Sequence, residues 1–176
     1  IMCGIVGGTS ERNILPILVE GLRRLEYRGY DSAGVAFKKN GTIDVIKNAG
    51  RVDQLAKKIK LEQNSAKLGI AHTRWATHGV PSEKNAHPHA SKDIFIVHNG
   101  IVENHEELKA QLRSEGMRFS SQTDSEVVAH LVQYYVEKGQ SFEKAVFNAI
   151  KKLKGAYALG ILNKKEPEQL IGIRNQ

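Results

Sequence analysis

The alternation of short β-prone runs with amphipathic helical segments constrains this fold more than any other feature. In the helical segments apolar residues recur every three or four positions, whereas the other runs are short, β-prone and bounded by turn residues. The predicted strands are residues 3–8, 33–37, 42–46, 67–71, 94–97, 156–162 and 169–173. The predicted helices are residues 13–25, 52–59, 103–115, 123–138 and 141–153. Because there is no internal repeat and no linker, this order predicts one α/β or α+β domain with substantial sheet content.

Two local signals refine this prediction. Asn40-Gly41 lies between two β-prone runs and predicts a tight hairpin turn. Residues 123–126 have the Thr-x-x-Glu pattern of a capping box, and Ser141 is placed to cap the last helix. Residues 73–93 are polar, rich in histidine and interrupted by two prolines, so we expect a long loop there.

The chain is basic, with 26 Lys and Arg against 19 Asp and Glu and a formal net charge of +7. Much of the excess lies in residues 51–67 and 151–154, inside or beside predicted amphipathic helices. Tyr27 and Tyr30 lie near basic residues but lack the pattern of a stacking platform for bases. A solvated basic face therefore explains the charge better than a nucleic-acid site.

A single cysteine, Cys3, excludes an internal disulfide and makes a reducing compartment the default. No apolar run approaches the roughly 20 residues that span a bilayer, and the first residues lack the pattern of a secretory signal. We therefore expect a cytoplasmic protein that does not bind a membrane.

The position of Cys3 favours a chemical role over the usual one of a small buried side chain. Since isoleucine is not a natural start, we expect Ile1 to be an added residue and Met2 the initiator. Removal of Met2 would place a free α-amine, with a pKa of about 7.7–8.0, on the residue that carries the thiol. An amine that is partly neutral near pH 7 can act as a general base, which would make Cys3 an activated nucleophile.

Further motifs follow Cys3 in a fixed order. They are residues 3–7 (CGIVG), 26–34 (EYRGYDSAG), 72–79 (HTRWATHG), 81–89 (PSEKNAHPH), 98–104 (HNGIVEN) and 123–126 (TDSE). Together they resemble the glutaminase domain of the glucosamine-6-phosphate synthase family, a branch of the class II glutamine amidotransferases. The resemblance implies an N-terminal-nucleophile hydrolase fold of the α+β class, with two stacked β-sheets sandwiched between helical layers (αββα). It implies neither a cofactor nor a metal.

The resemblance also implies the reacting groups. Cys3 would attack the side-chain amide of glutamine, while the Asn99 amide and the Gly100 backbone N–H would form the oxyanion hole. Glycine at position 100 would allow the close backbone approach that a side chain would block. Taken alone, Asn-Gly is more often a hairpin turn, and that alternative stays open here.

A second set of residues suits the two ends of an amino acid. Arg74 offers a planar fork of donors for the α-carboxylate, to which Thr77 and His78 can add donors. Asp124 can accept from the α-ammonium group, although an acid in the first turn of a helix also stabilises the helix dipole. Held at both ends, glutamine would present its side-chain amide to the nucleophile.

Supporting roles are implied for Arg28, Trp75, His87 and His98. Arg28 would order the cysteine loop, unless it is a turn residue with a solvated tip. Trp75 would help to gate the exit of ammonia, whereas in most proteins a lone tryptophan belongs to the core. For His87 and its neighbour His89 we favour structural hydrogen bonding over metal binding, because no carboxylate or cysteine stands at a ligand spacing beside them.

The predicted function is hydrolysis of L-glutamine to glutamate and ammonia. The resemblance implies that the ammonia passes to a sugar-isomerising domain, which converts fructose 6-phosphate to glucosamine 6-phosphate in a homodimeric full-length protein. We expect residues 3–176 to be a glutaminase domain that is incomplete at its C-terminal end, without that synthase domain. The alternatives are the glutaminase domain of an amidophosphoribosyltransferase or of asparagine or glutamate synthase, a basic nucleic-acid-binding module, and a regulatory domain that binds glutamine without cleaving it.

Overall fold

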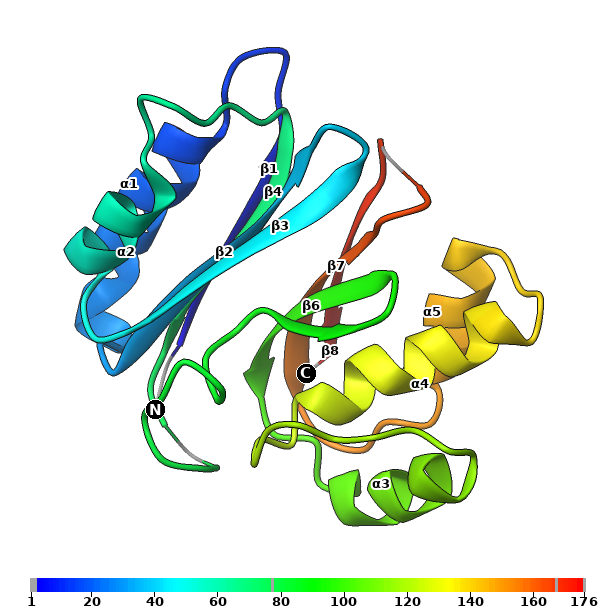
Figure 1. Ribbon diagram of the computed structural model, residues 1–176. Coiled ribbons are helices and arrows are strands. Elements are labelled where there is room, and N and C mark those ends of the chain that lie inside the picture. Colours follow the sequence, from blue (N-terminus) through cyan, green and yellow to red (C-terminus); the bar gives the residue numbers. More distant parts are fainter. Residues whose placement is uncertain (1–2, 77, 167, 176) are drawn as a thin grey trace.

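The computed structural model describes residues 3–76, 78–166 and 168–175 (Figure 1). The strands are β1 (Gly4–Thr9), β2 (Ser32–Lys39), β3 (Thr42–Ala49), β4 (Leu68–Arg74), β5 (His89–Ser91), β6 (Ile94–Gly100), β7 (Tyr157–Asn163) and β8 (Leu170–Asn175). The helices are α1 (Leu15–Leu25), α2 (Val52–Ile59), α3 (His105–Ser114), α4 (Glu126–Glu137) and α5 (Phe142–Ile150), with a short 3₁₀ turn, η1, at Glu26–Arg28. Each predicted strand and helix is present, and most ends are displaced by one to three residues.

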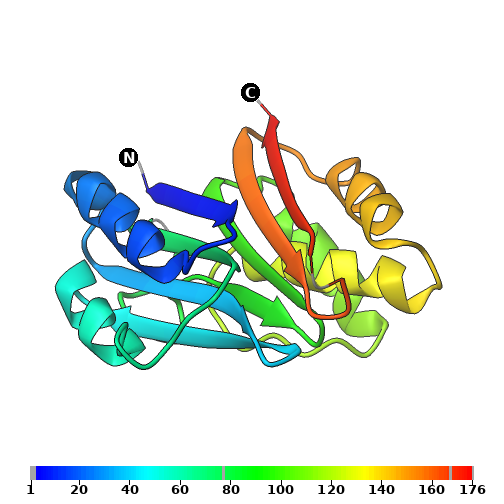
Figure 2. The same cartoon turned by 90° about the horizontal axis from the view of Figure 1, so that it is seen from above.

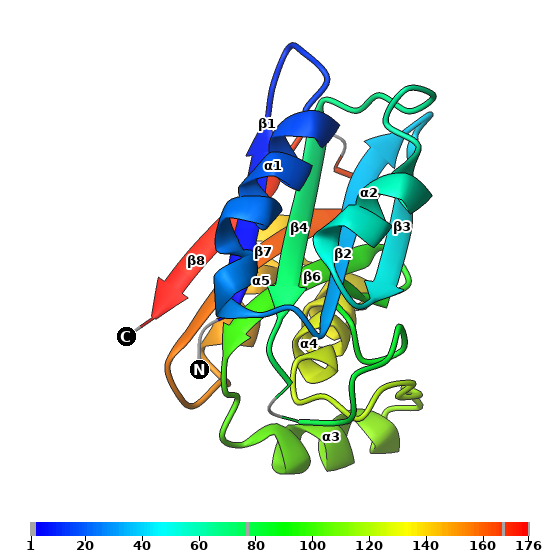
Figure 3. The same cartoon turned by 90° about the vertical axis from the view of Figure 1, so that its left-hand side faces the viewer.

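The strands form two antiparallel four-stranded sheets, in the orders β1-β4-β2-β3 and β5-β6-β7-β8. Helices α1 and α2 cover the outer face of the first sheet (Figure 3), and helices α3, α4 and α5 lie on the far side of the second (Figures 1 and 2). The α+β architecture of two stacked sheets between helical layers is therefore confirmed. In the described part of the chain, no helix has both the length and the apolar character needed to cross a membrane.

The core has three layers that follow from this stacking. One apolar cluster lies between the first sheet and its helices, another lies between the second sheet and its helices, and a third joins the sheets. Strand β4 contributes to two layers because successive side chains of a strand point to opposite faces. Ala71 packs towards α1 and α2, whereas Ile70 packs between the sheets. His72 and Arg74 share the face of Ile70, so β4 delivers polar groups to the same inter-sheet space.

The hairpin prediction is confirmed, since Asn40 and Gly41 both have positive φ, at 50° and 75°. This backbone suits the turn between β2 and β3, whose ladder continues to Lys39 and Thr42. The prediction of a loop over residues 73–93 is partly wrong. Strand β4 continues to Arg74, and β5 pairs with β6. A strand of three residues that follows a proline leaves little periodic signal in a sequence.

The capping box predicted at residues 123–126 does not form. Helix α4 begins at Glu126, and its N-cap makes no side-chain hydrogen bond. The Glu126 carboxylate instead accepts from the backbone N–H groups of Ser120 (2.8 Å) and Ser121 (2.6 Å), because the loop before the helix folds back over it. The Ser141 cap is confirmed, since its side chain accepts from the Lys144 N–H at 3.4 Å.

Candidate active site

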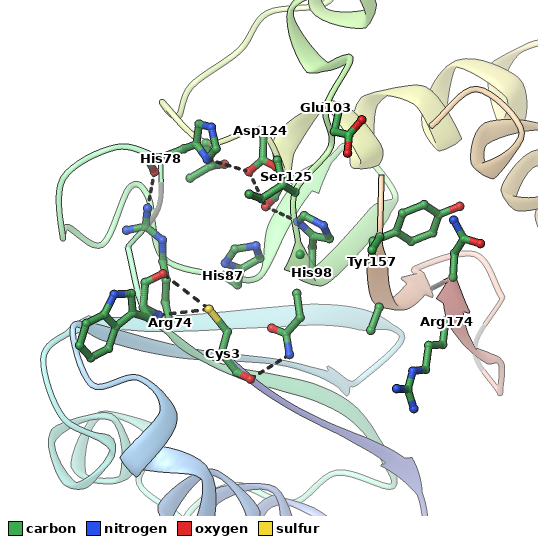
Figure 4. A pocket seen from close by; sticks show the side chains of 18 of the residues that line it. Cys3, Arg74, His78, His87, His98, Glu103, Asp124, Ser125, Tyr157 and Arg174 are labelled. Carbon is green, nitrogen blue, oxygen red and sulfur yellow. Dashed lines mark hydrogen bonds and ion pairs between the residues drawn. The ribbon is translucent and has the colours of Figure 1, made fainter. Parts of the chain in front are cut away.

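A cavity of about 650 Å³ opens between the two sheets at the end where β4 and β6 finish. Its lining includes every predicted site residue except Thr77, which lies outside the described residues. In Figure 4, Cys3 and Arg74 lie across the cavity from His98, Asp124 and Ser125. The predicted residues lie together because the inter-sheet face of β4 looks onto that of β6.

Cys3 stands at the entrance to β1, half-buried in the cavity wall. Its Sγ accepts a hydrogen bond from the Trp75 backbone N–H at 3.2 Å. Burial raises the pKa of the Cys3 thiol, and this outweighs the lowering effect of the Trp75 N–H. A thiol with a raised pKa is largely protonated at neutral pH, so a nucleophilic role needs a base beside it.

Asn99 connects the cysteine to the second sheet. Its Nδ2 donates to the Cys3 carbonyl at 3.0 Å, and its Oδ1 lies 2.9 Å from Nε2 of His72. Asn99 and Gly100 pair with Ala158 and Tyr157 in the β6–β7 ladder, so the alternative of a two-residue hairpin turn is wrong. Gly100 has a φ of 115°, and a Cβ there would lie 2.2 Å from the Ala156 carbonyl oxygen, so the site requires glycine.

Arg74 carries a buried guanidinium at the end of β4, with only 3% of the residue exposed. Its Nη2 donates to the backbone carbonyls of His78 and, at 3.2 Å, Gly79. Its Nη1 lies 3.9 Å from the Asp31 carboxylate and, within the described residues, makes no hydrogen bond. A buried cation with a spare donor at a cavity wall is suited to an incoming carboxylate.

Asp124 lies opposite, in the segment before α4, where it directly precedes the N-cap residue Ser125. Its carboxylate accepts from the Val102 N–H at 2.8 Å and lies 3.9 Å from Nδ1 of His78. The Ser125 hydroxyl is within 3.4 Å of the same carboxylate. A buried carboxylate at a cavity wall can take a further donor such as an ammonium group.

Four histidines at or beside the cavity, His72, His87, His89 and His98, are buried. Nδ1 of His98 contacts the Ser125 hydroxyl at 2.7 Å, and Nε2 of His89 contacts the Thr123 hydroxyl at 3.0 Å. For His87 the expectation of hydrogen bonding is wrong, because neither ring nitrogen has a partner among the described residues. Its ring is instead enclosed by other rings and stacks on His72 with centroids 4.0 Å apart. Burial holds the pKa values of His87 and His89 well below their usual range.

No cluster of three or more potential metal ligands occurs in the part of the chain that the structure describes. Two predicted residues lie at the rim. Nε of Arg28 donates to the Tyr27 hydroxyl at 3.0 Å. Trp75 is 43% exposed and meets the Tyr30 ring edge-on at 5.9 Å, so the alternative of a core tryptophan is wrong.

Several lining or supporting residues were missed. Asp31 accepts from the Ala76 N–H and from the Ser32 hydroxyl (2.9 Å), and thereby holds the start of the loop after β4. His72 contacts Asn99. Both lie inside the motifs quoted above, but a motif does not reveal which distant group each residue contacts. Glu103, Tyr157 and Arg174 also line the cavity.

The chain is similar to known proteins in both sequence and structure. The family profile described as "Glutamine amidotransferase domain" matches residues 72–176. A glutamine–fructose-6-phosphate aminotransferase (isomerizing) of Acinetobacter baylyi is 54% identical over 98% of this chain and 28% of its own length. The enzyme of the same name from Pseudomonas syringae pv. tomato is 51% identical over 99% of this chain and 29% of its own.

Among solved structures, the glutamine phosphoribosylpyrophosphate amidotransferase from B. subtilis superposes with a TM-score of 0.75 and 28% identity. The match covers 92% of this chain and 35% of that one. This likeness confirms the expected N-terminal-nucleophile fold. The chain thus spans less than a third of the length of the curated relatives named above.

Proposed function

The chain belongs to the glutamine amidotransferase domain family, and we propose that it hydrolyses the side-chain amide of L-glutamine through a thioester with Cys3. One observation carries this proposal. The Cys3 thiol, the Asn99 amide, the spare donor of Arg74 and the buried Asp124 carboxylate line one cavity of about 650 Å³. A nucleophile, an oxyanion donor and two charged anchors are the groups that this reaction needs.

The charged pair would hold the two ends of the amino acid. The Arg74 guanidinium takes the α-carboxylate through Nη1, with Thr77 and His78 as further donors. Asp124 accepts from the α-ammonium group. With both ends held, the side chain of glutamine extends towards Cys3, which converts the attack into an intramolecular step.

The reaction proceeds in two halves. Once Cys3 is the first residue, its α-amine takes the thiol proton and the sulfur attacks the amide carbon. The developing oxyanion accepts hydrogen bonds from the Asn99 Nδ2 and from the Gly100 N–H. Collapse of the tetrahedral intermediate breaks the C–N bond, and the amine proton leaves with ammonia. Water then hydrolyses the thioester to glutamate and regenerates the thiol. No cofactor enters this scheme.

The acceptor of the ammonia is the finer part of the proposal. Relatives at 54% and 51% identity are named for transfer to fructose 6-phosphate, whereas the phosphoribosylpyrophosphate enzyme is 28% identical. We therefore infer that residues 3–176 supply ammonia to a sugar-isomerising domain that forms glucosamine 6-phosphate. We place the full-length protein in the cytoplasm as a homodimer. In this scheme Trp75 gates the ammonia exit, Arg28 orders the cysteine loop, and His87 and His98 support the cavity wall.

The deciding experiment is intact-mass spectrometry of the protein before and after exposure to an electrophilic glutamine analogue. On a chain that begins at Cys3 we expect one adduct, on Cys3, which excess glutamine suppresses. Cys3→Ala should release no glutamate from glutamine, whereas Ser10→Ala, outside the cavity, should behave as wild type. Glutamate release by Cys3→Ala would overturn the mechanism.

Two other outcomes would favour the alternatives. Glutamine binding without labelling or turnover would indicate a regulatory domain. Nucleic-acid affinity that falls steeply with salt, together with no effect of glutamine, would indicate a basic binding module.

A further inference from the structure

His72 lies in the middle of the inter-sheet space and belongs to none of the roles proposed above. It is fully buried on β4, between Ile70 of the inter-sheet core and Arg74 of the cavity. Its Nε2 lies 2.9 Å from the His98 carbonyl oxygen and 2.9 Å from the Asn99 Oδ1, both on β6. This one nitrogen therefore joins the first sheet to the second, next to the reacting groups.

The two contacts determine where the ring proton lies. A carbonyl oxygen can only accept, so Nε2 of His72 must carry the proton that is shared with the His98 carbonyl. The asparagine atom beside it must then be an acceptor, which is Oδ1. The amide NH₂ consequently faces the other way, where it meets the Cys3 carbonyl at 3.0 Å. Burial lowers the pKa of His72 to about 3, so the neutral ring persists at neutral pH.

We propose that His72 is a positioning residue that orients the Asn99 amide, so that its NH₂ group faces the reacting centre at Cys3. One N–H of that group bonds the Cys3 carbonyl, and the second is left to stabilise the oxyanion. The opposite amide orientation would aim the partly negative Oδ1 at the developing negative charge. The inference rests on the proposed function, because it assigns Asn99 to the oxyanion hole.

The arrangement of the sheets explains why such a residue is needed. Cys3 directly precedes β1 of the first sheet, Asn99 lies on β6 of the second, and the cluster that joins the sheets is apolar. Apolar contacts resist separation but carry no direction, so they tolerate small displacements of one sheet over the other. A hydrogen bond from His72 to β6 supplies the direction. A 1 Å misplacement of reacting groups can cost about a hundredfold in rate.

The ring of His72 is itself held in place. It stacks on His87 with centroids 4.0 Å apart. Across the β2–β4 ladder its partner is Gly34, where a Cβ would lie 1.9 Å from the His87 carbonyl oxygen. The absence of a side chain at Gly34 therefore lets the His87 segment pack directly over β2, beside His72. A ring that cannot turn keeps its N–H aimed at Asn99.

The test uses His72→Phe in the full-length protein with Cys3 as its first residue. Phenylalanine keeps the ring but removes the donor. We expect kcat for glutamate release to fall by about ten- to a hundredfold, less than the loss of a whole oxyanion donor. KM for glutamine should stay within about twofold, because Arg74 and Asp124 are untouched. Thr73→Val is the matched control on β4, since the buried Thr73 hydroxyl has no hydrogen-bond partner in the described residues.

A double-mutant cycle separates positioning from general damage. If His72 acts through Asn99, His72→Phe should lower kcat by less than about threefold in an Asn99→Ala background. Equal losses in both backgrounds, or an unchanged kcat in the single variant, would overturn the proposal.

If His72→Phe does not fold, His72→Gln decides, because its amide can donate to both acceptors. A kcat within about threefold of wild type supports the proposal, and a folded His72→Gln with a loss of tenfold or more contradicts it. Absence of glutamine turnover by the wild-type protein would instead be a failure of the proposed function.

Discussion

The inter-sheet space has two ends that differ in chemistry, although β4 and β6 run through both. At one end Ile70, Val97 and Leu162 pack in an apolar cluster. At the other, β4 and β6 carry His72 and Asn99, which contact each other, and Asn99 lines the cavity. On β4 the change from apolar to polar side chains occurs between Ile70 and His72, which are successive residues on the same face of the strand. If His72 positions Asn99 as proposed, two neighbouring positions on one face of β4 serve stability and chemistry separately.

Unpartnered buried atoms gather at the polar end. Among the described residues, several buried nitrogens at this end have no hydrogen-bond partner. They are Nδ1 of His72, both ring nitrogens of His87, Nε2 of His98 and Nη1 of Arg74. A neutral group buried in this way costs about 1–3 kcal/mol relative to water, and a charged one such as the Arg74 guanidinium costs more. The apolar end must offset this cost, since burial of one large aliphatic side chain contributes about 1.5–3 kcal/mol. The polar end therefore lowers the stability of the fold, and apolar packing elsewhere between the sheets has to offset that loss.

The largest expected effect tests the apolar end. Ile70→Ala should destabilise the protein by about 2–5 kcal/mol, because it leaves a cavity among fully buried side chains. Urea unfolding would measure the loss, and KM for glutamine should not change in the folded fraction. Ile17→Ala is the control, since Ile17 is 57% exposed and should cost less than about 0.5 kcal/mol. Similar losses of stability at both positions would contradict the view that apolar packing between the sheets stabilises the fold.

The next effect concerns the polar end. Arg74→Gln should lower kcat/KM for glutamine roughly a hundredfold, chiefly through KM, because hydrogen bonds to a charged group contribute about 1.5–3 kcal/mol each. Steady-state kinetics would show this. The same change at Arg24, an exposed residue paired with Glu20, should leave both constants unchanged. An unaltered KM in Arg74→Gln would remove Arg74 from the substrate site.

A smaller effect is a dependence of stability on pH. The pKa of His72 in the folded state, about 3, lies below its ordinary value of 6.5, so the unfolded chain binds more protons between these values. The contribution of the neutral His72 ring to the free energy of unfolding is complete above pH 6.5. It is lost as pH falls towards 3, by about 1.4 kcal/mol per pH unit. Burial lowers the pKa values of His87 and His89 in the same direction. In urea titrations from pH 6 to 4, His72→Gln should show a shallower decline than wild type, and an identical decline would contradict this account.

The smallest expected effect concerns an exposed ion pair on the surface, away from the inter-sheet space. Lys67 pairs with Glu11 at 3.0 Å, but both side chains are largely exposed. Lys67→Gln should change the free energy of unfolding by less than about 0.5 kcal/mol, because exposed ion pairs are screened by water and salt. A loss above about 1 kcal/mol in the free energy of unfolding, measured with urea, would show that this exposed ion pair contributes more to stability than we expect.

Local pattern predicted the elements of the fold well. Helix α2 begins and ends where its apolar spacing predicted, and Asn40-Gly41 forms the expected turn. The failures came where a contact outside the helical or strand pattern overruled a local signal. Glu126 accepts from Ser120 and Ser121 instead of completing a capping box, and β5 exists only because β6 lies beside it. Such contacts leave no periodic trace in the chain.

The sequence by itself determined the kinds of groups available, because residue type sets charge, donor count and nucleophilicity. Its motifs made Cys3, Arg74, Asn99 and Asp124 the candidate site residues. Only the tertiary structure decided their partners. The strand alternation of β4 and the stacking of two sheets turned His72 towards Asn99, and the fold of the loop after β4 brought Asp31 to the Ala76 N–H. Hydrogen bonds depend on distance and direction in space, and positions 27 or 45 residues apart acquire both only when the strands pair and the two sheets pack.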